Sequence, residues 1–142
     1  MATMSPARWR SFLTERPRTA KLSTVRADGR PHVAPVWFDI DEDGSIVVMT
    51  GEGTVKGRAI RRDRRVGLCV DDEAPPIAFV TMDATATIVD DPDELLRWSI
   101  RIAGRYMGSD QAEEYGRRNA VPSELLVRLT PTHVVAEEGV AD

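Results

Sequence analysis

The chain has 142 residues, of which 42% are hydrophobic and 30% are charged, so it contains enough apolar side chains for a compact core and is not globally disordered. Nineteen Lys and Arg face 23 Asp and Glu, and this net charge of −4 excludes a generally basic nucleic-acid binder. No apolar stretch approaches the ~18 residues that span a membrane, and the one cysteine, Cys69, cannot form an internal disulfide. We expect a single cytoplasmic domain over residues 1–142, with Cys69 as a small buried side chain and with no nucleic-acid or membrane partner.

The first half of the chain predicts a helix followed by an antiparallel meander. Ser5 and Pro6 are typical of a helix start, and the helix should end at Pro17. Strands are predicted over residues 19–26, 31–40 and 45–50. The Asp28-Gly29 pair between the first two is a hairpin signal.

The second half alternates helices and strands. We predict a helix over residues 55–64, strands over 66–70, 77–82 and 84–89, helices starting near residues 90 and 109, and a last strand over 124–129 that 134–136 extend. Only one connection is of the β-α-β type, and the others are hairpins. The pattern therefore favours a mainly β, six-stranded antiparallel barrel with peripheral helices.

One basic segment departs from the acidic average. Residues 56–65 carry six Lys and Arg against the single acid Asp63, a local charge of +5 that begins at a predicted helix N-terminus. Backbone N–H groups and the helix dipole favour an anion there, and Lys56 would add a charged hydrogen bond. The alternative is a helix face that is simply solvated. Gly51, Gly53 and Gly57 also approach a dinucleotide-binding fingerprint, but the third glycine falls one place late.

Two apolar patterns have more than one interpretation. Pro35 within a strand predicts an edge, a bulge or a place where a ligand covers the backbone, and the Pro35-Val36-Trp37 surface suits a planar ring. Trp37 would otherwise be an ordinary core residue. The helical stripe of Trp98, Ile102 and Tyr106 packs either on its own barrel or at a subunit interface. Two histidines and one cysteine give no metal-ligand cluster, and no catalytic residue is assigned.

Three segments together resemble a known family. They are the hairpin from Asp28 to Phe38, the stretch from Val48 to Thr50 with the basic run from Lys56 to Val66, and the run from Val89 to Gly108. This order is similar to the split β-barrel flavin and deazaflavin oxidoreductases, the pyridoxamine 5′-phosphate oxidase-like superfamily. Within it, the chain looks most like the actinobacterial enzymes that use coenzyme F420.

The resemblance implies a homodimer with cofactor sites at the subunit interface and a hydride transferred between F420 and a small unsaturated substrate. The cofactor-binding positions that it implies are Val33, Ala34, Pro35, Val36 and Trp37 for the ring, Met49, Thr50, Lys56, Arg58 and Arg61 for the phosphate and tail, and Trp98. Many relatives carry Asn where this chain has Ala59. FMN as the cofactor, or a non-catalytic module that binds a flavin or tetrapyrrole, are the alternatives. The proton donor stays open between solvent, His32 and Tyr106.

Overall fold

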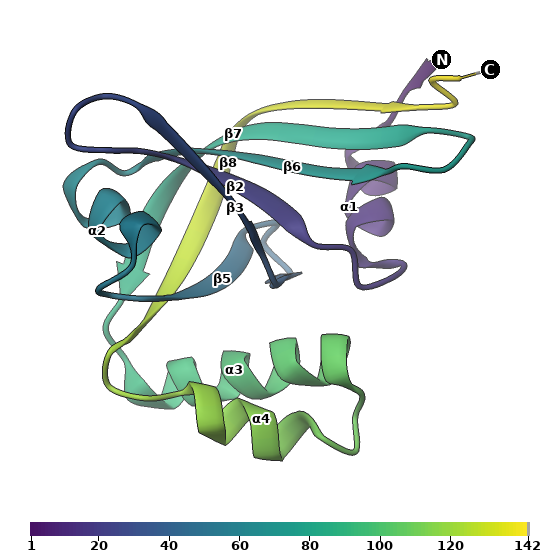
Figure 1. Cartoon of the computed structure of the whole chain (residues 1–142). Helices are drawn as coiled ribbons and strands as arrows, with labels where there is room; N and C mark the ends of the chain where they lie inside the picture. The colour runs from purple at the N-terminus through teal and green to yellow at the C-terminus, as the bar shows by residue number, and fades with distance from the viewer. Residues whose placement is uncertain (142) are drawn as a thin grey trace.

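The computed structural model describes residues 1–141, and this part of the chain forms eight strands and four helices (Figure 1). In chain order they are β1 (Ala2–Thr3), α1 (Pro6–Thr14), β2 (Ala20–Val25), β3 (Pro31–Val36), β4 (Phe38–Ile40), β5 (Ile46–Gly51), α2 (Val55–Arg62), β6 (Arg65–Asp72), β7 (Ala78–Val89), α3 (Pro92–Met107), α4 (Ala112–Asn119) and β8 (Glu124–Glu138). Within residues 1–141, none of the helices has both the length and the apolar character needed to cross a membrane.

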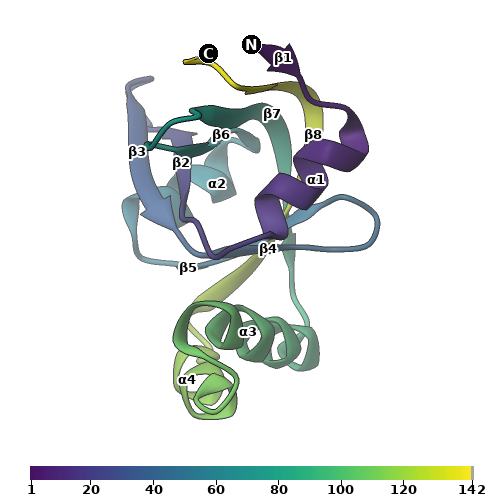
Figure 2. The same ribbon diagram turned by 90° about the vertical axis from the view of Figure 1, so that its right-hand side faces the viewer.

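The strands form one curled sheet in which every pair is antiparallel. The order is β3-β2-β6-β7-β8-β5-β4, and β1 adds to β8 beyond this path. β3 and β4 stand at opposite ends of this order, yet Trp37 alone connects them. The sheet must therefore curl until its two edges approach each other, and Figure 2 shows the resulting barrel. The predicted mainly β barrel is confirmed. Its six strands are β2, β5, β6, β7, β8 and the strand that Trp37 divides into β3 and β4, whereas β1 lies outside this path.

The core fills the barrel and continues under one pair of helices. Alternate residues of β2 and β7 point inward, and α1 adds Trp9, Phe12 and Leu13 to the same cluster. A second cluster, Val47, Trp98, Ile102 and Leu126, joins α3 to the outer face of β5 and β8. Figures 1 and 2 both show α3 and α4 as a layer below the barrel. The barrel and this helical layer thus meet along β5 and β8.

Several predicted boundaries are corrected by the structure. The runs 77–82 and 84–89 form one strand, β7, because a bulge at Asp83/Ala84 keeps the pairing with β8 continuous. Pro131 lies at this irregularity, where its missing N–H is tolerated, so β8 also continues past the expected bend. Cys69 is half-buried rather than buried, because it alternates with inward-facing neighbours along β6. The predicted helix over 55–64 ends at Arg62.

Candidate functional site

A cavity of about 390 Å³ lies beside Trp37, where one edge of the sheet passes to the other. Strands β3 and β5 contribute an apolar side, and α2, α3, α4 and β8 contribute the rest. Its lining residues are Pro35, Val36, Trp37, Met49, Lys56, Ser99, Ile102, Ala103, Arg118, Asn119, Val121 and Glu124. The volume falls within the range of small-molecule and cofactor pockets, which are mostly apolar with a few placed polar groups.

The apolar side of the cavity is built on a stacked pair of rings. Trp37 lies parallel to Tyr106 with 4.8 Å between ring centroids, and 38% of Trp37 is exposed. The Tyr106 hydroxyl donates to the Arg18 carbonyl oxygen at 2.7 Å and accepts from the Phe38 amide at 3.1 Å. Burial raises the pKa of Tyr106, so its hydroxyl remains protonated. Trp37 is therefore fixed from one side, while part of its surface is available to a ligand.

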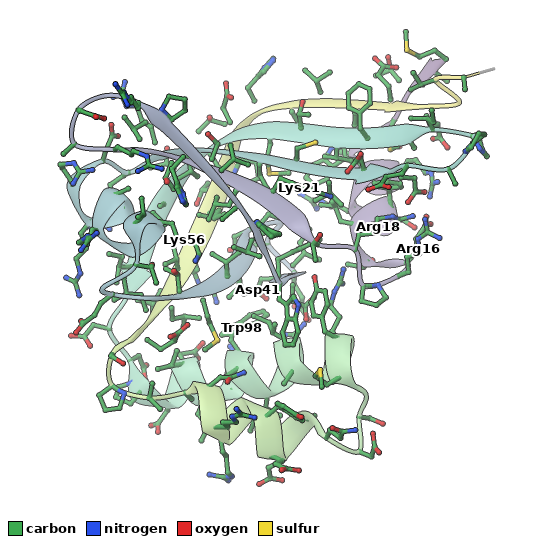
Figure 3. The ribbon with its side chains drawn as sticks, in the orientation of Figure 1. Arg16, Arg18, Lys21, Asp41, Lys56 and Trp98 are labelled. Carbon is green, nitrogen blue, oxygen red and sulfur yellow. The ribbon has the colours of Figure 1, made fainter. Side chains whose placement is uncertain are left out.

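The cationic end of the cavity is set by the start of α2. The Thr54 hydroxyl accepts from the Gly57 amide at 3.1 Å, and buried Thr50 lies 3.0 Å from the same hydroxyl oxygen. A Cβ at Gly57 would lie 2.2 Å from the Gly51 carbonyl oxygen, so glycine lets the helix sit directly on the end of β5. Lys56, in the first turn, reaches the cavity (Figure 3). A helix N-terminus and an ammonium group together favour an anion.

Five of the eleven predicted cofactor-binding positions line this one cavity. They are Pro35, Val36, Trp37, Met49 and Lys56. The other six lie outside its lining.

Each of those six has a different environment. Val33 is exposed on edge strand β3, Ala34 alternates with it, and Trp98 is fully buried in the cluster under α3. Thr50 supports the α2 cap from below. Arg58 lines a separate depression with Arg26 and Arg62, whereas Arg61 lies 3.6 Å from Glu52.

The basic segment divides between the cavity and the solvent. Lys56 is its member in the cavity, whereas Arg61, Arg62, Arg64 and Arg65 are exposed. The described sheet is entirely antiparallel and lacks the parallel β-α-β units of a dinucleotide-binding fold, in agreement with the misplaced third glycine. The glycine at position 57 serves the close approach of α2 to β5 instead.

Comparison with known proteins places this arrangement in a family. The model of the pyridoxamine 5′-phosphate oxidase family matches residues 5–136, which include the whole barrel from β2 to β7 and the cavity. The chain belongs to the pyridoxamine 5′-phosphate oxidase family. The resemblance carried by the three sequence segments is therefore confirmed.

Individual relatives within this family are similar at modest identity. An F420H(2)-dependent biliverdin reductase of Mycobacterium tuberculosis is 35% identical over 97 residues, which cover 68% of each chain. A 5a,11a-dehydrotetracycline/5a,11a-dehydrooxytetracycline reductase of Streptomyces rimosus is 40% identical over 55 residues, or 37% of this chain and 39% of that protein. A solved structure of a conserved hypothetical protein from Mycobacterium tuberculosis superposes with a TM-score of 0.84 at 26% identity, covering 96% of this chain and 86% of that one.

Four residues that line the cavity lie outside the motifs found in the sequence. Arg118, Asn119 and Val121 come from the end of α4 and the loop after it, and Glu124 opens β8. α4 is held in place because the buried Ser99 hydroxyl donates to the Gly116 carbonyl oxygen at 2.7 Å.

The other cavities contain few or none of the predicted cofactor-binding residues. A groove of about 710 Å³ between α1 and β8 is larger, but it contains none of the eleven predicted positions. Residues 1–141 contain no group of three or more His, Cys, Asp and Glu side chains arranged to hold a metal ion. The Trp37 cavity is therefore the candidate site.

Proposed function

We propose that this chain is an F420-dependent reductase that transfers a hydride to a small unsaturated organic substrate. The observation that carries the proposal is the Trp37 cavity, in which a fixed aromatic surface and the Lys56 ammonium lie on one lining. A deazaflavin has the matching chemistry, a planar ring with an anionic phosphate-containing tail. The names of the two curated relatives, both reductases, support the same activity.

The residues of the chain have separate tasks in this proposal. Trp37, backed by Tyr106, would position the ring, and Lys56 at the start of α2 would bind the phosphate. Met49, Ile102 and Ala103 would keep water from the ring and so prevent loss of the hydride. The bound cofactor supplies the hydride, while the protein supplies orientation and a dry pocket.

Titration of the purified protein with F420 and with FMN, followed by fluorescence, tests the cofactor. We expect saturable F420 binding that quenches tryptophan emission and weakens with added salt. Tighter binding of FMN would favour the flavin-dependent alternative, since the same ring surface and cation suit both molecules. Binding without turnover of any acceptor in a panel that includes biliverdin would indicate a non-catalytic carrier.

We further propose that the chain forms a homodimer through the outer face of β2, β3, β6 and β7. The predicted stripe is not available for this purpose, because Trp98 and Ile102 are buried within the chain. The outer sheet face instead carries Ser23, Gly67 and Cys69 around a shallow depression of about 310 Å³, and Val33 beside them is 63% exposed. β3 runs directly from this face to the Trp37 cavity, so a second copy bound here would adjoin the site.

Sedimentation at micromolar concentration tests the dimer. We expect a mass near twice 15.7 kDa. Val33→Asp should shift the protein to the monomer by placing a charge in the interface. A monomeric wild-type protein would contradict the interface, whatever the outcome of the cofactor titration.

A further inference from the structure

A carboxylic acid lies in the Trp37 cavity without an assigned task. Glu124 is the first residue of β8, where its backbone pairs with Gly51 of β5 and its amide donates to the Val121 carbonyl oxygen at 2.9 Å. Its side chain lines the same cavity as Trp37 and Lys56. Within residues 1–141, its carboxyl makes neither a hydrogen bond nor an ion pair. A partly buried acid without a structural partner is a candidate for chemistry.

Tyr106, His32 and Arg118 are less suited than Glu124 to donate a proton in this cavity. The Tyr106 hydroxyl already donates to the Arg18 carbonyl oxygen, and Tyr106 lies behind Trp37 rather than in the lining. His32 does not line the cavity, although its Nδ1 is buried without a partner. Arg118 does line it, but a guanidinium does not release its proton in proteins. Among the described lining residues, Glu124 is the only carboxylic acid.

We propose that Glu124 is the general acid that protonates the substrate as it is reduced. The inference rests on the proposed function, because the hydride comes from the reduced cofactor. A new C–H bond forms at the acceptor carbon of a polarised C=C or C=N group, and the electrons of the double bond move to its other atom. The Glu124 O–H bond then breaks, the proton goes to that atom, and the carboxylate regains a proton from water.

The charges around Glu124 are consistent with this role. Burial raises the pKa of the Glu124 carboxyl, and the positive charge of Lys56 on α2 acts in the opposite direction. Arg118 on α4 is the other charged lining residue, whereas α3 contributes Ser99, Ile102 and Ala103. An anionic ligand at Lys56 would offset that positive charge and raise the pKa of Glu124 further. The acid should therefore be protonated more fully when the cofactor is bound, as donation requires.

Carbon-13 NMR of the glutamate carboxyl groups tests the placement directly. We expect the pKa of Glu124 to lie above the ordinary value, to rise on saturation with F420, and to rise in Lys56→Met without cofactor. Glu124→Gln identifies the resonance, and Glu114→Gln on exposed α4 is the matched control. An ordinary pKa that F420 does not change would overturn the proposal.

Kinetics with reduced F420 and 2-cyclohexenone or biliverdin as acceptor tests the proton transfer. Glu124→Gln should bind F420 within about threefold of wild type, yet lower kcat by about 10²- to 10⁴-fold. We expect wild-type kcat to decrease at high pH as Glu124 loses its proton, and this decrease should disappear in the variant. Wild-type kcat in Glu124→Gln would overturn the role of Glu124 alone, whereas failure of the wild-type protein to bind F420 would overturn the proposed function.

Discussion

Trp37 and Tyr106 stack almost in parallel, with 4.8 Å between centroids and 3° between ring planes. The pair joins the break between β3 and β4 to helix α3, because the Tyr106 hydroxyl bonds to the backbone of Phe38 and Arg18. The indole thus has its orientation before any ligand arrives. A fixed aromatic surface loses little side-chain entropy on binding and so favours affinity.

Replacement of Trp37 by Ala should impair ligand binding more than folding. Because 38% of Trp37 is exposed, we expect a loss of about 1–2 kcal/mol in the free energy of unfolding, below the roughly 3–5 kcal/mol of a core tryptophan. F420 affinity should fall by about tenfold or more, and Trp37→Phe should retain most of it. Urea denaturation and fluorescence titration measure the two effects. Normal folding with unchanged affinity would show that no ring packs on Trp37.

Lys56 and Arg64 offer a matched comparison within the basic segment. Lys56 lines the cavity at the start of α2, whereas Arg64 is exposed beyond the end of that helix. A charged hydrogen bond of about 1.5–3 kcal/mol predicts that Lys56→Ala weakens F420 binding by roughly 10- to 100-fold. Arg64→Ala should change it little. Equal, small effects in a titration at low salt would place the anion elsewhere.

Glycines at positions 57 and 53 differ in the space around them. A Cβ at Gly57 would lie 2.2 Å from the Gly51 carbonyl oxygen, while a Cβ at Gly53 would have no neighbour within 4 Å. Gly57→Ala must therefore push α2 away from β5 and displace Lys56. We expect a loss of about 1–3 kcal/mol in unfolding free energy and weaker F420 binding. Gly53→Ala, measured in the same denaturation series, should stay within about 0.5 kcal/mol of wild type.

The Arg18–Asp72 pair predicts an acid-sensitive contribution to stability. Arg18 donates to both oxygens of Asp72, at 2.6 and 3.0 Å, and this lowers the pKa of Asp72 to about 2 (Figure 3 shows Arg18). Since the unfolded chain binds this proton more readily, the stabilisation is complete above about pH 4 and disappears as the pH falls toward 2. Its size is about 2 kcal/mol.

Asp72→Asn measures this contribution. The variant should lose about 2–3 kcal/mol in unfolding free energy at pH 7, because Arg18, 7% exposed, would keep a charge without its main partner. The difference from wild type should shrink as the pH approaches 2. Asp28→Asn, in an exposed turn, is the control and should have little effect. A loss that is the same at pH 7 and pH 2 would contradict the ionic origin.

The sequence could predict those parts of the molecule that depend on neighbouring residues. The Ser5 and Thr54 caps, the Asp28-Gly29 turn and the edge position of Pro35 follow from local chemistry, and the structure has all of them. By contrast, β7 continues past Asp83 because of a bulge in its pairing with β8 near Pro131. Pro131 is 48 positions from Asp83 in the chain, so no local sequence pattern reveals this pairing.

The residues of the candidate site likewise fall into those that a local sequence pattern indicated and those that only the tertiary structure reveals. Pro35, Trp37 and Lys56 belong to segments with unusual composition, and they line the cavity. Glu124 and Arg118 come from ordinary polar stretches. Arg118 reaches the cavity through the packing of α4 on α3, and Glu124 reaches it through the pairing of β8 with β5. Arg58 and Trp98 belong to the resembling segments, but Arg58 lines a separate depression and Trp98 is buried in the cluster under α3.

The single-residue link between β3 and β4 also limits how the chain can change in length. Side chains alternate between the two faces of a strand, so one residue inserted beside Trp37 would turn either β3 or β4 inside out relative to the core. Val36 and Phe38, both buried, would then be on the wrong face of one edge. Insertions should be accepted instead at the exposed turn around Asp28, which lies at the far end of β3. The length of the β3–β4 edge is therefore fixed by the core on which both strands pack.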